Sequence, residues 1–289
     1  MSDKLRNFIV RTLSGAVLLL VILGAMLIGY YGYLALLLLI TIGGVWEFYN
    51  LSKAKAYEPQ RGCGLLISLF VYITGASIGF NLINATNDGL EISIFSLCGV
   101  ILLVSTVFFV EVFRNRTTPM VNVATTLAGP IYVAVPMALM AVVPLMLAND
   151  GEWKALYFLF YLFLVWGNDV FAYLAGVTMG RHQMCERLSP KKSWEGFVGG
   201  VLGSLAVGTL AAYIFDESYG LWLGLALVVS LTSVVGDLVE SMFKRDAGVK
   251  DSGNIIPGHG GILDRFDALI LSAPCAFIYL CIALFATNI

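Results

Sequence analysis

Long apolar stretches dominate this sequence, and they limit its fold to a small set of architectures. An α-helix needs about 20 apolar residues to cross the hydrocarbon core of a bilayer. The chain is only 12% charged, whereas soluble domains carry about 25% charged residues. We therefore predict an all-α protein, a polytopic integral membrane helical bundle of about nine transmembrane helices. The expected spans cover residues 8–29, 31–50, 63–84, 91–113, 121–147, 154–179, 195–215, 219–243 and 264–287.

The distribution of Lys and Arg predicts the orientation of these helices, because short cytoplasmic loops carry an excess of basic residues. Every Lys and Arg except Lys154 falls before the first span, in alternate connections, or at the span ends beside them. We therefore expect a cytoplasmic N-terminus and a multi-pass protein of the cell's inner (cytoplasmic) membrane. The two longest connections, residues 182–194 and 245–263, would then face the cytoplasm. The first apolar stretch is longer than the core of a signal peptide, so we expect a retained helix.

The fifth expected span contains three prolines, Pro130, Pro136 and Pro144. Proline removes a helical hydrogen bond, so this span should be kinked or broken, with its neighbours satisfying the freed backbone groups. The sequence contains no internal repeat, and its densest charged clusters lie in the second half. We expect one integrated membrane domain, in which residues 1–150 form N-terminal helices and residues 151–289 form the catalytic helices and cytoplasmic loops.

The densest charge lies in the sequence GDLVESMFKRDAGVKDSGNIIPGHGGILDRFD, which begins at Gly236. Four polar residues at the end of the eighth span stand at helical positions i, i+3, i+4 and i+7: Asp237, Glu240, Ser241 and Lys244. That spacing places them on one helix face. Asp264 and Asp267 are spaced i, i+3 at the start of the ninth span. The glycine-rich segment between the two spans can bring backbone N–H groups close to an anion.

Carboxylates at the membrane edge are costly, and they mark functional sites by default. Several facing Asp residues repel one another unless a cation lies between them, and oxygen ligands suit Mg²⁺ together with substrate phosphate. Lys and Arg in the same place suit phosphate as well. The pattern therefore predicts Mg²⁺-assisted chemistry on a phosphate. The alternative is an ordinary solvated loop, with acids and lysines at the helix ends.

A second polar cluster lies around Asp169, which stands inside an otherwise apolar span. An acid there needs a partner from another helix, so a purely structural network is one interpretation. The segment SPKKSWEG follows, with Lys191 and Lys192 beside the membrane. These lysines fit anionic lipid headgroups, although a simple excess of basic residues on the cytoplasmic side also explains them. Glu47 and Glu111 stand near cytoplasmic helix ends, where we favour structural pairing.

The run SMFKRDAGVKDSGNIIPGHGGILDRFD, from Ser241 to Asp267, resembles the signature of the phosphatidate cytidylyltransferases, also called CDP-diacylglycerol synthases. The segments NDVFAYLAG and SPKKSWEG extend the likeness over the C-terminal half, whereas the N-terminal half resembles the family only as a set of hydrophobic spans. Members of the family often have Asp-Thr where this chain has Asp169 and Val170. That departure leaves the acidic residue in place.

The resemblance implies the reaction of CTP with phosphatidate to give CDP-diacylglycerol and pyrophosphate. It implies a Mg²⁺ ion held by Asp237 and Asp264, with K⁺ as a candidate second ion. The implied catalytic residues are Asp237, Asp264, Lys244, Arg245 and Asp267. The implied substrate- and cofactor-binding residues are Lys250, Asp251, His259, Gly260, Gly261, Arg265, Ser241, Lys191, Lys192, Ser189 and Asp169.

Two other functions compete with this one. A CTP-dependent lipid kinase of the polyprenol or dolichol type would share the nucleotide and the membrane setting but transfer the γ-phosphate to an alcohol. An ion or solute transporter would need polar residues through the bilayer midplane and repeat symmetry, neither of which the sequence displays. The expected partners are CTP, phosphatidate and the lipid bilayer, with no nucleic acid. The sequence leaves open whether the chain forms a homodimer.

Overall fold

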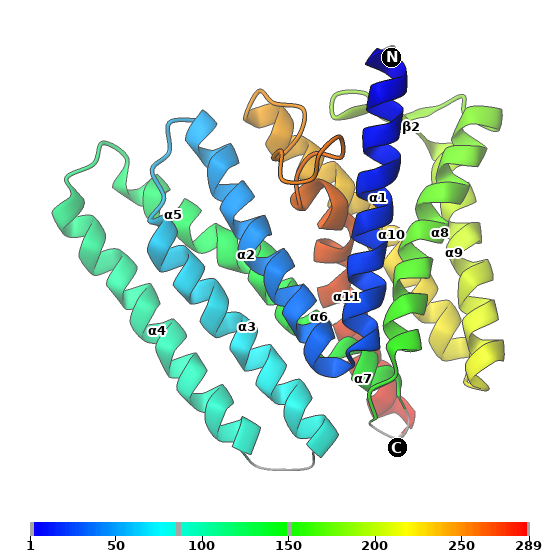
Figure 1. The fold of residues 1–289 in the computed structure, drawn as a ribbon, viewed down its shortest axis with the longest axis horizontal. Helices are drawn as coiled ribbons and strands as arrows, with labels where there is room; N and C mark the ends of the chain where they lie inside the picture. The colour runs from blue at the N-terminus through cyan, green and yellow to red at the C-terminus, as the bar shows by residue number, and fades with distance from the viewer. Residues whose placement is uncertain (1–2, 85–87, 149–151, 288–289) are drawn as a thin grey trace.

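The computed structural model describes residues 3–84, 88–148 and 152–287, and it has the expected helical architecture (Figure 1). Within these residues, nine helical spans are long and apolar enough to cross a membrane, which confirms the predicted fold class. The helices of the first four spans and the broken fifth are α1 (Asp3–Leu27), α2 (Tyr30–Ala54), α3 (Arg61–Asn84), α4 (Asp88–Arg114), α5 (Pro119–Gly129), η1 (Pro130–Ala134), α6 (Val135–Met140) and α7 (Val143–Leu147). The remaining elements are α8 (Ala155–Met179), β1 (Gln183–Cys185), β2 (Ser189–Ser193), α9 (Trp194–Phe215), α10 (Tyr219–Asp246) and α11 (Leu263–Thr287).

The helices are arranged around a central group. In Figure 1, α3 and α4 pack together at one side and α8 and α9 at the other. Helix α11 lies between them and contacts α2, α6 and α10. Among the nine spans of the described chain, the broken fifth span is the most buried and α1 is the least buried. The fifth span is therefore part of the protein core, whereas α1 lies on the outside.

The broken fifth span confirms the prediction from its prolines. It runs as α5, a π-helical turn over Pro130–Ala134, and the short helices α6 and α7. Pro130 has no N–H for the carbonyl of Thr126, and the buried hydroxyl of Tyr49 donates to that carbonyl instead, at 2.6 Å. Pro144 likewise leaves the Met140 carbonyl free, and it accepts from the hydroxyl of Tyr33 at 2.5 Å. Tyrosines of α2 thus satisfy backbone groups that two of the prolines release.

Replacing Tyr49 by Phe should therefore destabilise the bundle. The buried Thr126 carbonyl would lose its donor, and an unsatisfied buried group costs about 1–3 kcal/mol. Thermal unfolding in detergent should report a lower midpoint for Tyr49→Phe. Tyr31→Phe is the matched control, because Tyr31 lies on the same helix and is 68% exposed. Equal midpoints for the two variants would contradict this account of the proline breaks.

A short antiparallel hairpin, β1–β2, replaces part of the expected loop over residues 182–194, and it forms the one β-sheet of the described chain. The hairpin leads directly into α9, where the hydroxyl of Ser193 accepts from the N–H of Gly196 at 3.1 Å and caps the helix. The carboxylate of Glu195 accepts from the N–H groups of Arg181 and His182 at 3.1 and 3.2 Å. The hairpin is thus fixed between α8 and α9.

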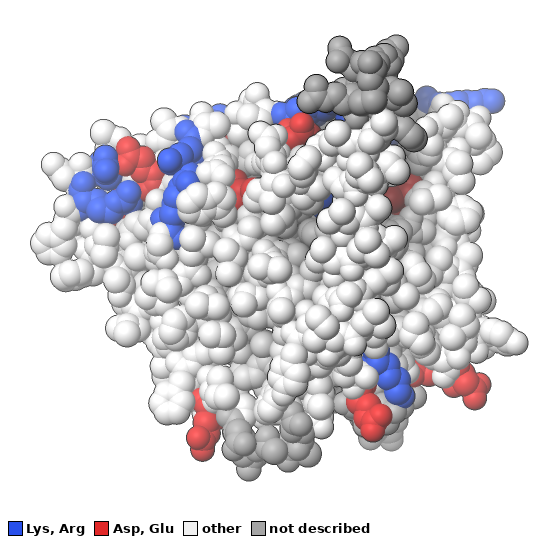
Figure 2. All heavy atoms as spheres, viewed as in Figure 1, with Lys and Arg blue, Asp and Glu red and all other residues white. Residues whose placement is uncertain are grey.

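Charge is distributed unequally between the two ends of the bundle. Figure 2 shows most Lys and Arg side chains along one edge and mainly acidic side chains at the other. We call the first edge the basic end; it contains the ends of α2, α4, α8 and α10 and the starts of α3, α9 and α11. Lys154, the N-cap of α8, is at the opposite end. The structure thus has the asymmetry that the sequence predicts, and the orientation in a cell membrane stays a prediction.

Candidate active site

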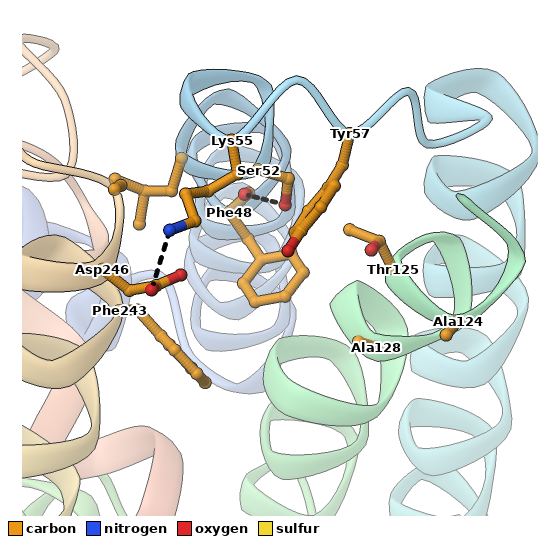
Figure 3. Close-up of a pocket in the computed structure, with 11 residues that line it drawn as sticks. Phe48, Ser52, Lys55, Tyr57, Ala124, Thr125, Ala128, Phe243 and Asp246 are labelled. Atoms are coloured by element: carbon orange, nitrogen blue, oxygen red, sulfur yellow. Dashed lines mark hydrogen bonds and ion pairs between the residues drawn. The ribbon is translucent and has the colours of Figure 1, made fainter. Parts of the chain in front are cut away.

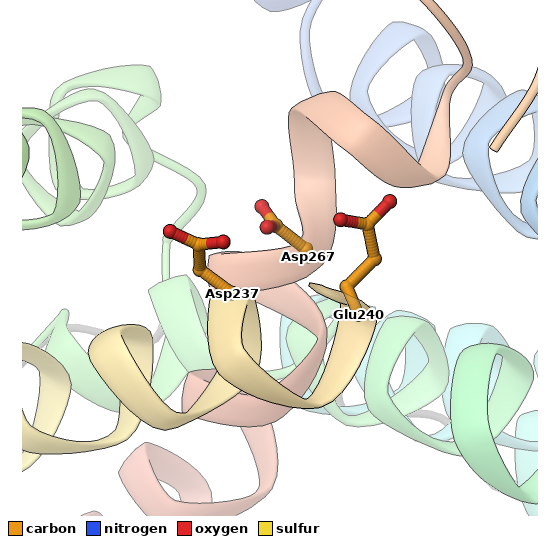
Figure 4. Close-up of side chains that lie close together, drawn as sticks. All are labelled: Asp237, Glu240 and Asp267. Atoms are coloured by element: carbon orange, nitrogen blue, oxygen red, sulfur yellow. The ribbon is translucent and has the colours of Figure 1, made fainter. Parts of the chain in front are cut away.

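Three carboxylates converge at the basic end of the bundle. Asp237 and Glu240 project from α10 and Asp267 from α11, and each offers an oxygen that lies within 4.8 Å of the others (Figure 4). We call these residues the acidic group. Asp237 and Glu240 meet because they are spaced i, i+3 on one helix. Asp267 joins them because α10 and α11 pack closely at this level.

Gly236 makes this close packing of α10 and α11 possible. A Cβ atom at Gly236 would lie 2.5 Å from the carbonyl oxygen of Asp267 and 3.2 Å from the Cα of Ala268. Any other residue would therefore push the two helices apart, and the acidic group with them. The glycine that precedes Asp237 thus sets the geometry of the site.

Lys244 connects the acidic group to Asp264. Its ammonium forms ion pairs with the carboxylates of Glu240 and Asp264, the second at 2.7 Å. The other oxygen of Asp264 accepts from the backbone N–H and the hydroxyl of Ser252, both at 2.9 Å, and from the N–H of Gly261 at 2.7 Å. Asp264 is therefore already surrounded by donors.

The structure thus groups the sequence-predicted site residues differently from the expected Asp237–Asp264 pair. Asp237 lies with Asp267 and Glu240, whereas Asp264 joins the α10–α11 connection to Lys244. Glu240 was not among the predicted site residues, although its i, i+3 spacing from Asp237 was a usable signal. Ser241 adds a weak contact, because its hydroxyl lies 3.3 Å from a carboxylate oxygen of Asp237.

The acidic group has the chemistry of a site for a hard cation. Its ligand atoms are all carboxylate oxygens, which Mg²⁺ prefers. Glu240 is 1% exposed, and its Oε1 has no hydrogen-bond partner in the described part of the chain. Three like charges this close together oppose one another unless a cation or protons offset them. The residues therefore fit a divalent metal ion, with Asp237 and Asp267 best placed beside Glu240.

A cavity of about 520 Å³ lies beside the acidic group, between α8, the hairpin, α9 and α10; we call it the lateral cavity. Its polar lining includes Asp169, Lys191, Lys192 and Asp237. Its lining also includes Tyr173 of α8, which is 70% exposed and would contact lipid in a membrane. The ammonium of Lys192 lies 2.6 Å from a carboxylate oxygen of Asp237, so the cavity borders the acidic group directly.

Asn168 also lines this cavity, and the sequence analysis did not predict it as a site residue. Its side chain is 1% exposed, and neither its oxygen nor its nitrogen has a hydrogen-bond partner among the described residues. An unpaired buried amide is costly, so its presence in the cavity wall points to a polar ligand. Its position next to Asp169 in an apolar span was the only available signal.

A second, polar cavity of about 490 Å³ lies over the glycine-rich connection of residues 247–262, which we call the GHG loop. The positive φ angles of Gly258 and Gly260, 73° and 85°, form a tight turn that most side chains would strain. The turn is closed by the bond from the N–H of Ile256 to the carbonyl of Gly260. The predicted site residues that the structure brings together here are Lys250, Asp251, His259, Gly260 and Arg265.

Other predicted site residues lie outside both cavities. Ser189 lies in β2, opposite Cys185. Arg245 is exposed and donates to the carbonyl of Val249 at 3.1 Å. Gly261 is buried beside Asp264, to which its N–H donates. The structure thus gives Ser189 and Arg245 no contact with the acidic group within the described chain, and their roles stay predictions.

A smaller cavity of about 280 Å³ lies at the ends of α2, α5 and α10 (Figure 3). Phe48 and Phe243 line it, and an ion pair of 3.0 Å between Lys55 and Asp246 borders it. No member of the acidic group lines this cavity. It is therefore separate from the site described above.

The acids expected to pair structurally do so. Glu47 of α2 is 1% exposed; it accepts from the N–H of Leu263 at 2.9 Å, and its carboxylate lies 3.1 Å from the hydroxyl oxygen of Ser252. Glu111 accepts from the side chains of Gln60 and Arg114, both at 2.8 Å. Glu47 thereby anchors the GHG loop to α2, which was not apparent from the sequence.

Fold and site together define a polytopic membrane protein with an acidic group, whose oxygens suit a cation, beside a cavity with an exposed apolar side. Residues 9–283 match the profile of the cytidylyltransferase family, and the chain belongs to that family. It is 30% identical over 302 aligned positions to the phosphatidate cytidylyltransferase of Synechocystis sp., covering 96% of this chain and 98% of that protein.

Relatives from staphylococci are more similar over a shorter region. The phosphatidate cytidylyltransferase of Staphylococcus aureus strain COL is 49% identical over 124 residues, which covers 42% of this chain and 48% of that protein. The protein of the same name from Staphylococcus haemolyticus is 46% identical over 129 residues, with 44% and 48% coverage. The match thus spans about half the length of these relatives.

Proposed function

We propose that the protein transfers the cytidylyl group of CTP to phosphatidate, giving CDP-diacylglycerol and pyrophosphate for phospholipid biosynthesis. One observation carries this proposal: the Lys192–Asp237 contact of 2.6 Å joins a lipid-facing cavity to an acidic group suited to a metal ion. A lipid phosphate held at Lys192 would lie next to that group. Membership of the cytidylyltransferase family and the names of the relatives agree with this chemistry.

The reaction needs an oxygen of the lipid phosphate to attack the α-phosphorus of CTP in line. A new P–O bond forms, the bond from the α-phosphorus to the bridging oxygen breaks, and pyrophosphate leaves with the electron pair. Positioning and charge neutralisation account for most of the gain in such a step. Phosphatidate is already largely ionised at neutral pH, so the step needs no separate strong base.

The lateral cavity would bind the lipid substrate. Lys191 and Lys192 would hold its phosphate, and the amide of Asn168 would donate to or accept from its polar glycerol region. The acyl chains of the bound lipid would extend past Tyr173 into the surrounding bilayer. Asp169 stands close enough to Lys192 and Asp237 to influence both charges.

The acidic group would hold Mg²⁺ through Asp237 and Asp267, with Glu240 beside them. When bound, such an ion neutralises charge on the α-phosphate and the leaving group. Asp264, the second ligand predicted from the sequence, would become available only if Lys244 left its Oδ1 atom. Until then, Asp264 holds Lys244 and the GHG loop in place. The second ion, K⁺, remains a prediction.

The basic end would face the cytoplasm of an inner membrane. CTP is soluble and highly charged, whereas phosphatidate keeps its chains in the bilayer, so the reaction needs a site at the membrane surface. The acidic group, the lateral cavity and the polar cavity over the GHG loop lie at the basic end. The excess of Lys and Arg at this end supports its cytoplasmic placement.

The test is to determine which product carries the label of radiolabelled CTP. Purified protein in detergent–lipid micelles is incubated with phosphatidate, Mg²⁺ and CTP labelled at either the α- or the γ-phosphate. Cytidylyl transfer places the α-label in the lipid and the γ-label in pyrophosphate. A lipid kinase given a polyprenol would place the γ-label in the lipid and release CDP. A protein that transfers neither label, under conditions where it remains folded, would contradict the proposal.

Lys192→Met should selectively weaken the use of phosphatidate. Loss of a hydrogen bond to a charged group costs about 1.5–3 kcal/mol, so kcat/KM for the lipid should fall roughly 10- to 100-fold. Arg181→Met is the control, because it removes a positive charge near the same hairpin but outside the lateral cavity. KM for CTP should change little in either variant. An equal loss in both variants would count against a role for Lys192 at the lipid phosphate.

A further inference from the structure

The outermost helix, α1, makes specific polar contacts with the GHG loop. The guanidinium Nε of Arg11 donates to the carbonyl of Gly258 at 3.0 Å. The hydroxyl of Ser14, one turn further along, lies 2.6 Å from Nδ1 of His259. The two segments are 247 and 245 residues apart along the chain. Because α1 is the least buried of the described spans, these contacts stand out from the general packing.

The contact with Ser14 fixes the orientation of the His259 ring. The Ser14 hydroxyl donates to the carbonyl of Val10 at 2.8 Å, which leaves its oxygen free to accept from the ring. In the tautomer with its proton on Nδ1, the ring donates to Ser14. Partial burial, Arg265 and Arg11 all lower the pKa of His259, so the ring tends to be neutral. The positive charge of the polar cavity therefore comes from other side chains.

Three of those side chains are cationic: Arg11, Lys250 and Arg265. Arg265 donates from Nε to the carbonyl of His259 at 3.0 Å, so the two arginines hold neighbouring carbonyls of the GHG loop. Within the described residues, none of the three forms an ion pair, and the one acidic lining residue is Asp251. A cavity lined by three cations and one carboxylate, none of them in a described ion pair, suits a polyanion.

The polar cavity is also connected to the acidic group. The GHG loop donates to Asp264 from the backbone of Ser252 and Gly261. Asp264 in turn pairs with Lys244, which pairs with Glu240. A charged ligand in the polar cavity would therefore lie across a short chain of direct contacts from the proposed metal ligands.

We propose that α1 completes a binding site for the β- and γ-phosphates of the nucleotide, with Arg11 as a binding residue and Ser14 as a positioning residue for His259. This inference rests on the proposed cytidylyl transfer, and it assigns the polar cavity to the part of CTP that leaves as pyrophosphate. Arginine suits this role because its planar group binds phosphate oxygens in pairs. It would also offset the charge that develops on the leaving group.

Equilibrium binding to the purified full-length protein tests the inference without turnover. Isothermal titration with CTP, CMP and inorganic pyrophosphate, in the absence of phosphatidate, compares the wild type with Arg11→Gln. Loss of one charge-assisted contact should lower the affinity of Arg11→Gln for CTP and for pyrophosphate roughly 10- to 100-fold. CMP affinity should stay unchanged, because CMP lacks the β- and γ-phosphates. Arg11→Lys should retain part of the affinity for CTP and pyrophosphate. Ser14→Ala should lower the affinity for these two ligands a few-fold.

Lys53→Gln is the matched control, because Lys53 also lies at the basic end but lines none of the three cavities described above. Its affinities should equal those of the wild type. Arg265→Gln changes another cationic lining residue of the polar cavity and should show the same selective loss, which guards against a folding defect in either arginine variant. Equal losses for CMP and CTP, or wild-type affinities in Arg11→Gln, would overturn the inference.

The two proposals fail in distinguishable ways. If labelled CDP-lipid forms while Arg11→Gln binds CTP and pyrophosphate like the wild type, the α1 site is wrong and the proposed function stands. If no CDP-lipid forms but pyrophosphate affinity depends on Arg11, the polar cavity is an anion site and the proposed function is wrong.

Discussion

Asp237→Asn is expected to abolish turnover while the protein still inserts, folds and purifies. Asp237 is the one residue that belongs to both the acidic group and the lateral cavity. Its substitution removes a proposed metal ligand and the partner of Lys192 together. Losing such electrostatic stabilisation at a phosphoryl centre should lower kcat roughly 10³-fold or more. The measurement is CDP-lipid formation under saturating CTP, phosphatidate and Mg²⁺.

Asp246→Asn is the matched control for this prediction. Asp246 lies at the end of the same helix and forms an exposed ion pair with Lys55, in which its side chain is 62% exposed. Exposed pairs contribute little to stability, so its activity should stay within a few-fold of the wild type. Titration with Mg²⁺ separates weaker metal binding from lost chemistry. Near-normal turnover of Asp237→Asn at saturating Mg²⁺ would refute the role assigned to the acidic group.

The acidic group also separates what the sequence can predict from what it cannot. The i, i+3, i+4, i+7 spacing correctly places Asp237, Glu240 and Lys244 on one face of α10, since that follows from helix geometry alone. Whether Asp264 or Asp267 joins the carboxylates of that face, and which one pairs with Lys244, depends on how α11 is rotated about its axis. The rotation is set by packing at Gly236 and by the bonds from the GHG loop to Asp264. Neither effect is local in sequence.

The fold likewise has features that the sequence predicts and features that it does not. Hydropathy identifies the nine spans of the described chain, because the bilayer imposes length and composition on each helix separately, and the three prolines identify the break in the fifth. The hairpin β1–β2 escapes prediction, because its strands are short and polar. The tyrosines of α2 that satisfy the proline-freed carbonyls lie 77 and 107 residues away from them. The contact of Arg11 with Gly258 spans an even longer separation.

Lys244→Met should cause the largest loss of stability of any substitution discussed here. The Lys244 side chain is 12% exposed, and it compensates the carboxylates of Glu240 and Asp264, which are 1% and 6% exposed. Removing one partner of a buried ion pair costs about 3–5 kcal/mol, because an uncompensated charge remains. Methionine has a similar length and is apolar, so the loss would reflect charge rather than volume. Thermal unfolding in detergent should show a midpoint lower by on the order of 10 °C.

The neighbouring residue provides the control. Arg245→Met removes a positive charge one position away, but Arg245 is exposed and makes one side-chain hydrogen bond, to Val249. Its free energy of unfolding should change by less than about 1 kcal/mol. Adding Glu240→Gln to Lys244→Met removes one uncompensated charge and should recover part of the lost stability. If Lys244→Met unfolds at the same temperature as Arg245→Met, then Lys244 does not hold the two carboxylates together, and Asp264 would be free to serve as the metal ligand that the sequence predicts.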